Sequence, residues 1–268
     1  MLLLAALAAI GLALLFGAFA VARQSRRCAE VAAVGFVVLL VGRAALAARA
    51  DWEWALFPWP GYAFVHGFVL YGLAAAFFGV VATTLPVRWN RVVVLGVGLG
   101  VLGHGVHRHT WLAWPEVHGD ARVAGADHHL RQSSHYTCGP AACAAALSHH
   151  GVKATERELA AACLTRREGT RLFDLYRGIV QTLGDRPFDV SIEAVTAEQI
   201  VAEGLVVVGA NAGRGHALCI AATGGQVVVH DPLRPVAERS SLEHLHREFR
   251  PPAIVIRPRP LAAAPPGR

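Results

Sequence analysis

The chain has 268 residues, of which 54% are hydrophobic and only 16% are charged, and its mean hydropathy is +0.41. An ordinary soluble domain carries roughly 25% charged residues, so this composition excludes a disordered chain and argues against a wholly water-soluble protein. Residues 1–116 hold 12 of the 44 charged side chains, and residues 117–268 hold the other 32. We therefore predict a membrane domain over 1–116, a water-soluble domain over 117–258 and a disordered tail at 259–268.

The net charge of +6 does not indicate a nucleic-acid partner. No run of Lys or Arg reaches the roughly five to eight residues of a nucleic-acid patch. The only lysine, Lys153, lies in Gly-Val-Lys-Ala, which is not the phosphate-binding loop of an ATPase. The sequence thus predicts that this chain binds neither nucleic acid nor ATP, and no motif in it indicates a cofactor.

Four apolar stretches lie near residues 1–22, 29–48, 61–85 and 92–107. Each approaches or exceeds the roughly 20 residues that cross a bilayer as a helix. All six tryptophans lie at or beyond the ends of these stretches, as is typical of the headgroup region. We expect an all-α membrane domain of about four transmembrane helices.

The arginines between these stretches predict the orientation. Three arginines lie in or beside the first loop: Arg23, Arg26 and Arg27. Two lie in the third loop: Arg88 and Arg91. The second loop carries one arginine and two acids: Arg49, Asp51 and Glu53. The positive-inside rule places the first and third loops in the cytoplasm, and the soluble domain on the extracytoplasmic side of the plasma (inner) membrane. Cleavage of a signal peptide near Ala18-Phe19-Ala20 is the alternative for the first stretch.

The histidines near the end of the fourth stretch do not have the spacing of a metal site. We expect His104, His107 and His109 to lie at the membrane interface, and we predict no metal in this protein. Cys28 follows two arginines without a lipobox and is expected to be a passive thiol.

After a polar connector at 117–131, residues 138–151 have the pattern of a helix. Pro140 suits the first helical turn, an alanine-rich run follows, and Gly151 is suited to end the helix. Cys138 therefore lies at the helix N-terminus, where free N–H groups and the helix dipole favour a thiolate. A thiolate in this position is what a cysteine nucleophile requires.

Three other cysteines in this half lie in apolar surroundings and do not form a Cys-x-x-Cys pair: Cys143, Cys163 and Cys219. We expect buried structural thiols. A disulfide between Cys143 and Cys163 stays open, because its geometry is not readable from sequence.

Further along, the pattern predicts helices near Glu156–Leu164 and Arg171–Leu183 and strands near 187–195 and 205–211. Gly224-Gly225 between two apolar runs predicts a two-residue hairpin. That turn pairs residue 223 with residue 226, and therefore Leu218 with Asp231. His216 and Asp231 then become diagonal neighbours on one face of the hairpin, within side-chain reach.

Cys138, His216 and Asp231 carry the side chains that acyl transfer requires. An imidazole oriented by an acid is the second half of a Cys-His-Asp triad, and Cys138 supplies the nucleophile. The amide of Gln132, six residues before Cys138, can donate to a developing oxyanion together with the Cys138 backbone N–H. Each residue alone has a structural explanation, and Asp231-Pro232 is an ordinary turn opener, but together they favour catalysis.

This set of residues, with the motifs around it, resembles that of the bacteriocin-processing cysteine peptidases, which remove double-glycine leader peptides. The resemblance covers about residues 130–258 and rests on short motifs: Gln132, Cys138-Gly-Pro-Ala-Ala, Gly169-Thr170 with Leu172 and Leu175, Gly215-His216, His230-Asp231-Pro232, and Ser241-Leu242 with Phe249. It implies a papain-like α+β fold with Cys138 as nucleophile, His216 as base, Asp231 as orienting acid and Gln132 as oxyanion donor. The best-known members are fused to a transporter with an ATPase on the cytoplasmic side, whereas a four-helix membrane unit precedes this domain.

We therefore predict a membrane-anchored cysteine peptidase that works through a thioester acyl-enzyme. Two alternatives stay open: an acyl or peptidyl transferase of the same fold, and a non-catalytic membrane receptor for peptides. The expected partners are a peptide or protein substrate and the lipid bilayer, with a separate transporter or secretion protein as a further candidate.

Overall fold

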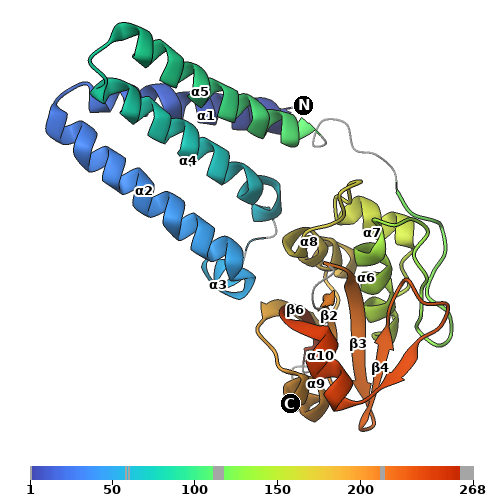
Figure 1. Ribbon diagram of the computed structural model, residues 1–268. Coiled ribbons are helices and arrows are strands. Elements are labelled where there is room, and N and C mark those ends of the chain that lie inside the picture. Colours follow the sequence, from blue (N-terminus) through green and yellow to red (C-terminus); the bar gives the residue numbers. More distant parts are fainter. Residues whose placement is uncertain (1, 58, 60, 111–117, 212–214, 260–268) are drawn as a thin grey trace, which may run out of the picture. The chain divides into compact units, whose positions relative to one another are not determined.

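The computed structural model describes residues 2–57, 59, 61–110, 118–211 and 215–259. The chain divides into two compact units. The first contains four long helices, and the second contains a six-stranded sheet, its covering helices and the short helix α3 (Ala50–Leu56). Figure 1 shows the elements of both units.

The first unit is a bundle organised around one central helix. Its helices are α1 (Leu2–Ala22), α2 (Arg26–Ala48), α4 (Tyr62–Thr84) and α5 (Arg88–Arg108). Helix α4 packs against the other three. Leu15, Ala75 and Val80 are fully buried in this unit, so its core lies between the helices.

The outward surface of these helices is apolar, which is unusual for a bundle in water. Val31 of α2 is 73% exposed, and Val34 and Val38 on the same helix are also mostly exposed. A contiguous apolar surface of this kind indicates contact with a membrane or another protein. All four helices are long and apolar enough to cross a bilayer, in agreement with the sequence prediction.

Two of these helices begin earlier than their apolar stretches. Helix α2 starts at Arg26, after Ser25 accepts a capping hydrogen bond from the Cys28 N–H, and α5 starts at Arg88. The apolar stretches at 29–48 and 92–107 therefore lie within helices that begin about one turn earlier. Hydropathy marks the apolar span, whereas the helix also includes the arginine-bearing turn before it.

The second unit is built on an antiparallel sheet in the order β1-β6-β2-β3-β4-β5. Its strands are β1 (Phe188–Glu193), β2 (Val206–Asn211), β3 (Ala217–Thr223), β4 (Gln226–His230), β5 (Glu238–Ser240) and β6 (Phe249–Pro258). Every neighbouring pair is antiparallel. The last long strand, β6, is inserted between β1 and β2, so the sheet does not follow chain order.

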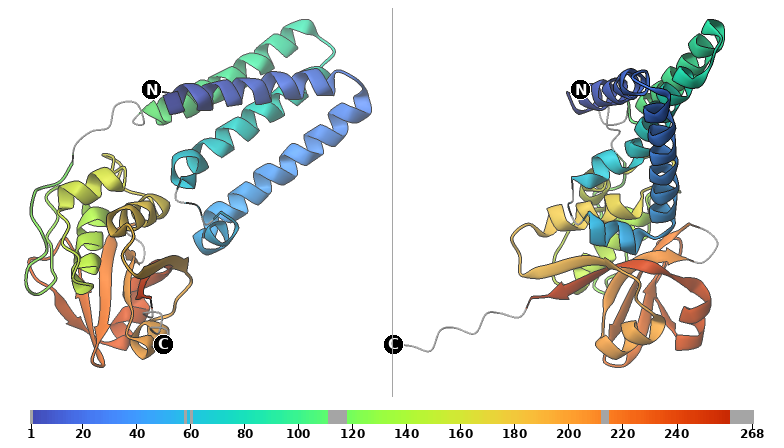
Figure 2. Two further views of the ribbon diagram at one scale, coloured as in Figure 1. Left: turned by 180° about the vertical axis from the view of Figure 1, so that it is seen from behind. Right: turned by 90° about the vertical axis from the view of Figure 1, so that its left-hand side faces the viewer.

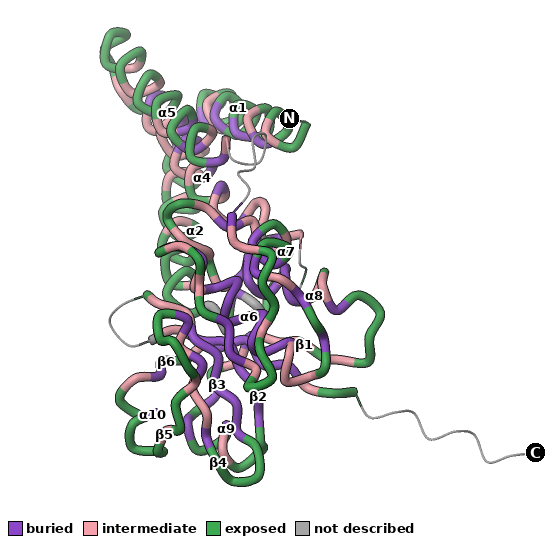
Figure 3. Tube along the Cα trace, turned by 90° about the vertical axis from the view of Figure 1, so that its right-hand side faces the viewer, coloured by how far each residue is buried: buried purple, intermediate pink, exposed green. Residues whose placement is uncertain are grey.

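Helices cover both faces of this sheet. They are α6 (Cys138–His149), α7 (Glu156–Ala162), α8 (Leu172–Leu183), α9 (Ala197–Glu203) and α10 (Leu242–Glu248). Helix α6 packs on β2 and β3 and α8 on β1 and β6, whereas Ile200 of α9 and Leu245 of α10 join the core on the opposite face. Figure 2 shows the sheet between these layers, and Figure 3 shows how deeply β2, β3 and α6 are buried. The unit is α+β, as predicted.

The β3–β4 hairpin has the predicted register. Thr223 pairs with Gln226 and Cys219 pairs with His230. Gly224 and Gly225 form the turn with φ angles of +60° and +78°, which is the conformation that suits a right-twisted two-residue hairpin and that side chains disfavour. The turn therefore fixes where the open ends of β3 and β4 lie relative to each other.

The other predicted elements of this unit are present with shifted ends. Helix α7 ends at Ala162 rather than near 164, because Leu164 has a φ of +52°. Strand β1 spans 188–193 rather than 187–195. Five further elements were not predicted from the sequence: α3, α9, α10, β5 and β6. Of the predicted tail at 259–268, residues 260–268 lie outside the described residues.

Candidate active site

Cys138 is the first residue of α6, as the sequence predicted. Its side chain is half-buried, whereas Thr137 before it and Gly139 after it are buried. A Cβ at position 139 would lie 2.6 Å from a methyl carbon of Leu175 in α8, so a larger residue after the cysteine would require the Leu175 side chain to move. Helix α8 therefore packs directly against the turn that presents the thiol.

His216 and Asp231 meet at the open end of the hairpin. His216 lies one residue before β3 and Asp231 one residue after β4. The Nε2 atom of His216 lies 2.6 Å from Oδ1 of Asp231, and both side chains are largely buried. Because Asp231 occupies Nε2, the other ring nitrogen, Nδ1, is left to face the thiol.

The electrostatics of Cys138 and His216 favour an ion pair. Burial raises the pKa of the Cys138 thiol, but hydrogen bonds from the His216 side chain and the Ala217 backbone, and the charge of His216, outweigh burial and lower this pKa overall. Burial lowers the pKa of His216, but its hydrogen bonds to Cys138 and Asp231 outweigh burial and raise this pKa overall. A lowered thiol pKa beside a raised imidazole pKa favours thiolate and imidazolium.

Gln132 lies in the loop before α6, where its backbone N–H donates to the Pro232 carbonyl at 3.0 Å. Its amide Nε2 donates to the Ser134 carbonyl at 2.6 Å. The reverse amide orientation would direct an oxygen at that carbonyl, so the hydrogen-bond network fixes the assignment. One amide N–H is thus engaged by the Ser134 carbonyl, whereas the Oε1 atom of Gln132 is buried and has no hydrogen-bond partner among the described residues.

The remaining thiols of this unit are buried and free, as expected for structural cysteines: Cys143, Cys163 and Cys219. Burial raises the pKa of Cys143 and Cys219. Cys143 and Cys163 are both free thiols in this structure, and their side chains are hydrogen-bonded neighbours. Cys28 of the first unit is also a free thiol.

Two of the histidines predicted to be interfacial, His104 in α5 and His109 directly after it, contact aromatic rings of α4. Tyr71 packs against His104 and His109, and His109 is buried with its Nδ1 2.7 Å from the Gly105 carbonyl. Within the described part of the chain, no group of three or more His, Cys, Asp or Glu side chains is placed to hold a metal ion.

A group of imidazoles lies beside the acid of the site. His230 directly precedes Asp231, is 1% exposed, and its Nε2 lies 2.9 Å from Nε2 of His149. Burial lowers the pKa of His149 to about 4 and that of His230 to about 3. Both rings are therefore uncharged near neutral pH, and neither competes with His216 as a cation for Asp231.

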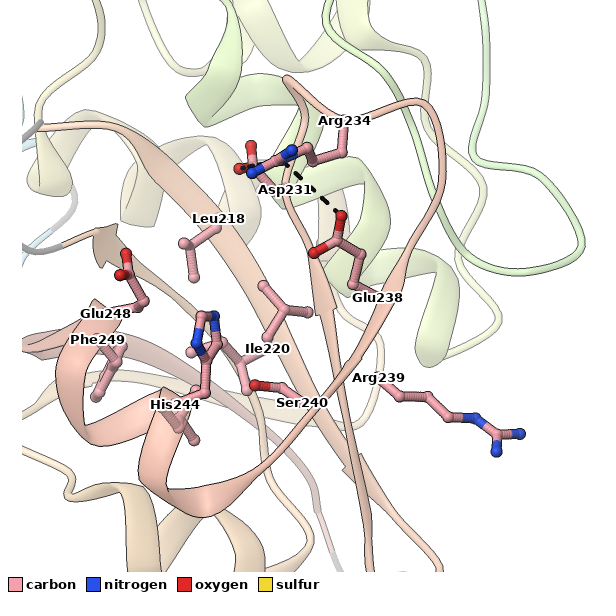
Figure 4. Close-up of a pocket in the computed structure, with 12 residues that line it drawn as sticks. Leu218, Ile220, Asp231, Arg234, Glu238, Arg239, Ser240, His244, Glu248 and Phe249 are labelled. Atoms are coloured by element: carbon pink, nitrogen blue, oxygen red, sulfur yellow. Dashed lines mark ion pairs between the residues drawn. The ribbon is translucent and has the colours of Figure 1, made fainter.

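A cavity of about 200 Å³ begins at Asp231 and extends between β3–β5 and α10 (Figure 4). Its apolar lining comes from Leu218, Ile220, Val229, Leu245 and Phe249, and its polar lining from Asp231, Arg234, Glu238, Arg239, Ser240, His244 and Glu248. Arg234 lies 4.0 Å from Asp231 and 3.9 Å from Glu238. The cavity thus has an apolar surface, and both positively and negatively charged side chains, next to the open end of the β3–β4 hairpin.

One buried polar residue beside the Gln132 loop was not predicted from the sequence. Glu156, at the start of α7, is fully buried and accepts hydrogen bonds from the backbone N–H groups of Ser133 and Asp120. Its partners lie 23 and 36 residues earlier in the chain, so neither periodicity nor spacing indicated this role.

An α+β domain with a cysteine of lowered pKa at a helix start, next to a histidine bound to an aspartate, has the groups expected of a cysteine-type peptidase. The chain belongs to the peptidase C39 family, whose model matches residues 127–260. The predicted papain-like peptidase domain, preceded by long apolar helices, is thereby confirmed, and the chain is a cysteine-type peptidase.

Two solved structures are similar to about half of this chain. One is the peptidase domain of Streptococcus ComA, a bi-functional ABC transporter involved in a quorum-sensing pathway (20% identity, 48% of this chain and 97% of that chain, TM-score 0.41). The other is a double glycine motif protease from an AMS/PCAT transporter in complex with the leader peptide (16% identity, 52% of this chain and 94% of that chain, TM-score 0.42). No curated protein matches the chain.

Proposed function

We propose that this protein is a membrane-anchored cysteine peptidase in which Cys138, His216 and Asp231 form the catalytic triad and Gln132 donates to the oxyanion. The observation that carries the proposal is the 2.6 Å contact between His216 and Asp231 at the imidazole that hydrogen-bonds Cys138. Nucleophile, base and orienting acid come from three different segments and meet at one point, as such chemistry requires.

In the first step, the Cys138 thiolate attacks the carbonyl carbon of the scissile peptide bond. The carbonyl oxygen becomes an oxyanion, which accepts hydrogen bonds from the Gln132 amide and the Cys138 backbone N–H. The C–N bond then breaks as the His216 imidazolium gives its proton to the leaving amine. The products are a free amine and a thioester on Cys138.

In the second step, His216 is neutral and takes a proton from water as the water oxygen attacks the thioester. The C–S bond breaks, the acyl group leaves as a carboxylic acid, and the thiolate–imidazolium pair is restored. Asp231 accepts from Nε2–H of His216 throughout and stabilises the imidazolium form.

The proposed substrate is a peptide or protein. The mixed apolar and charged lining of the cavity beside Asp231 suits a peptide chain, which presents side chains of both kinds. A double-glycine leader is the candidate cleavage motif, since a similar solved structure is a double glycine motif protease with its leader peptide. A separate transporter is the matching candidate partner, because both similar structures come from transporters.

A peptide probe with a thiol-reactive group tests the catalytic assignment. Incubated with the full chain in detergent near neutral pH, the probe is expected to label Cys138 and not Cys143, Cys163 or Cys219, because the pKa of the Cys138 thiol is lowered and the other three thiols are buried. Peptide mapping by mass spectrometry identifies the labelled residue. Labelling of the buried thiols with Cys138 unmodified would contradict the proposal.

The four apolar helices are proposed to span the plasma membrane, with the peptidase unit on the extracytoplasmic side. Reporter fusions after Arg27, Asp51, Arg91 and Gly119 keep the arginines of each loop and are expected to report inside, outside, inside and outside, because arginines concentrate at the first and third junctions. Alkaline phosphatase and fluorescent-protein fusions measure the two sides. A cytoplasmic signal after Gly119 would reverse the orientation and favour a leader-cleaving role on the cytoplasmic side.

A further inference from the structure

Glu156 is a completely buried carboxylate outside the proposed triad. Its Oε1 accepts from the Ser133 N–H at 2.8 Å, and its Oε2 accepts from the Asp120 N–H at 3.0 Å. A buried carboxylate is unfavourable unless hydrogen bonds compensate it, and bonds to an ionised acceptor are among the strong ones. Both oxygens are used, so this side chain holds two backbone segments in place.

One of these segments is the loop that carries Gln132. The Ser133 N–H belongs to the same planar peptide unit as the Gln132 carbonyl. Holding that N–H therefore sets ψ of Gln132, while the bond from the Gln132 N–H to the Pro232 carbonyl restrains the peptide on its other side. The backbone from which the Gln132 amide projects is thus fixed from both directions.

The other segment has anchors that do not depend on the carboxylate. The Glu156 backbone N–H donates to the Arg122 carbonyl at 3.1 Å, and the Arg157 N–H donates to the Asp120 carbonyl at 2.9 Å. Main-chain bonds of α7 therefore still hold residues 120–122 if the side chain is changed. The Ser133 N–H, in contrast, is held by the Glu156 carboxylate itself, so the loop at Gln132 is the part that the side chain controls.

We propose that Glu156 is a positioning residue that holds the Gln132 loop, and thereby aims the Gln132 amide at the oxyanion. This inference rests on the proposed function, since it assigns Gln132 the oxyanion role. Glu156 does not touch the substrate. By positioning Gln132, Glu156 stabilises the transition state, in which the negative charge of the oxyanion develops.

The test compares Glu156→Gln with Glu158→Ala in the full chain in detergent. Glutamine keeps the shape of the side chain but offers one acceptor oxygen, so it directs an NH₂ group at one of the two backbone donors. Glu158 lies on the same helix, is exposed, and forms the capping box with Thr155. Its replacement weakens α7 without touching the Ser133 bond, which makes it the matched control.

We expect Glu156→Gln to lower kcat about tenfold with KM within about twofold, because a displaced oxyanion donor weakens transition-state stabilisation and not substrate binding. The pH profile of Cys138 alkylation should stay unchanged. Glu158→Ala should lower Tm and keep kcat. If Glu156→Gln does not fold, Glu156→Asp, which keeps the charge but is shorter, enters the same comparison. Equal kcat values for the Glu156 and Glu158 variants would mean that Glu156 is only structural.

A double-mutant cycle with Gln132→Ala separates this inference from the proposed function. If Glu156 acts through Gln132, adding Glu156→Gln to Gln132→Ala lowers kcat no further. An additional tenfold loss in that background would overturn the positioning role while leaving the oxyanion role of Gln132 intact. An unchanged kcat in Gln132→Ala alone would overturn the oxyanion role itself, and the positioning role with it.

Discussion

Replacing Cys138 with alanine is expected to lower the rate of peptide hydrolysis by at least about 10⁴-fold. The change removes the sulfur that attacks the carbonyl, and the remaining groups cannot form the thioester. Cys138→Ser should be nearly as inactive, because a hydroxyl is not ionised near neutral pH. The measurement is kcat for a peptide substrate, with Tm as the check that each variant is folded.

Cys143→Ala is the matched control for this experiment. Cys143 lies on the same helix, is fully buried and has a raised thiol pKa. Its replacement leaves a small cavity and should lower Tm while turnover persists. Hydrolysis retained in purified Cys138→Ala would show that another residue is the nucleophile.

Asp231→Asn is expected to lower kcat by about 10- to 10⁴-fold. The amide keeps the shape of the side chain but loses the charge that stabilises the His216 imidazolium. The pKa of His216 should fall, and that of the Cys138 thiol should rise in response. The thiolate then forms over a narrower pH range that begins at higher pH. The roughly 10⁴-fold end of this range is the loss known for serine triads. A smaller loss in kcat is expected here, because a thiol at a helix start depends less on the acid of the triad.

Two measurements decide the role of Asp231: kcat, and the pH dependence of Cys138 alkylation. The alkylation midpoint should move to higher pH in Asp231→Asn. Asp189→Asn serves as the control, because Asp189 is an exposed carboxylate on β1 that pairs with Arg259. Wild-type activity together with an unshifted alkylation profile would make Asp231 a turn residue only, with another group orienting His216.

The parts of the site that follow from local rules were predictable from sequence. Pro140 and the alanines after it indicated a helix starting at Cys138, and the two glycines at 224–225 set the hairpin register. That register brings His216 and Asp231 together without any knowledge of the rest of the fold. Both features depend on neighbours a few residues away, so the chain itself carries the signal.

Features that depend on distant segments were not predictable in this way. Strand β6 pairs with both β1 and β2, and no local pattern specifies that insertion. Glu156 is defined by backbone donors in two earlier segments. Helix α9 is different, because Thr196 and Gln199 form a capping box and Gly204 ends the helix in the left-handed conformation. Those signals are present in the sequence, and a search for capping boxes finds them.

The contrast between Cys138 and the buried thiols also governs how the enzyme responds to oxidants. A half-exposed thiolate is the form that peroxide converts to sulfenic acid, and a nearby reactive thiol normally rescues it as a disulfide. Cys143, Cys163 and Cys219 are fully buried, and burial raises the pKa of Cys143 and Cys219, so these two thiols supply little of the thiolate that would form such a disulfide. Recovery of an oxidised Cys138 would then depend on a thiol from outside this unit.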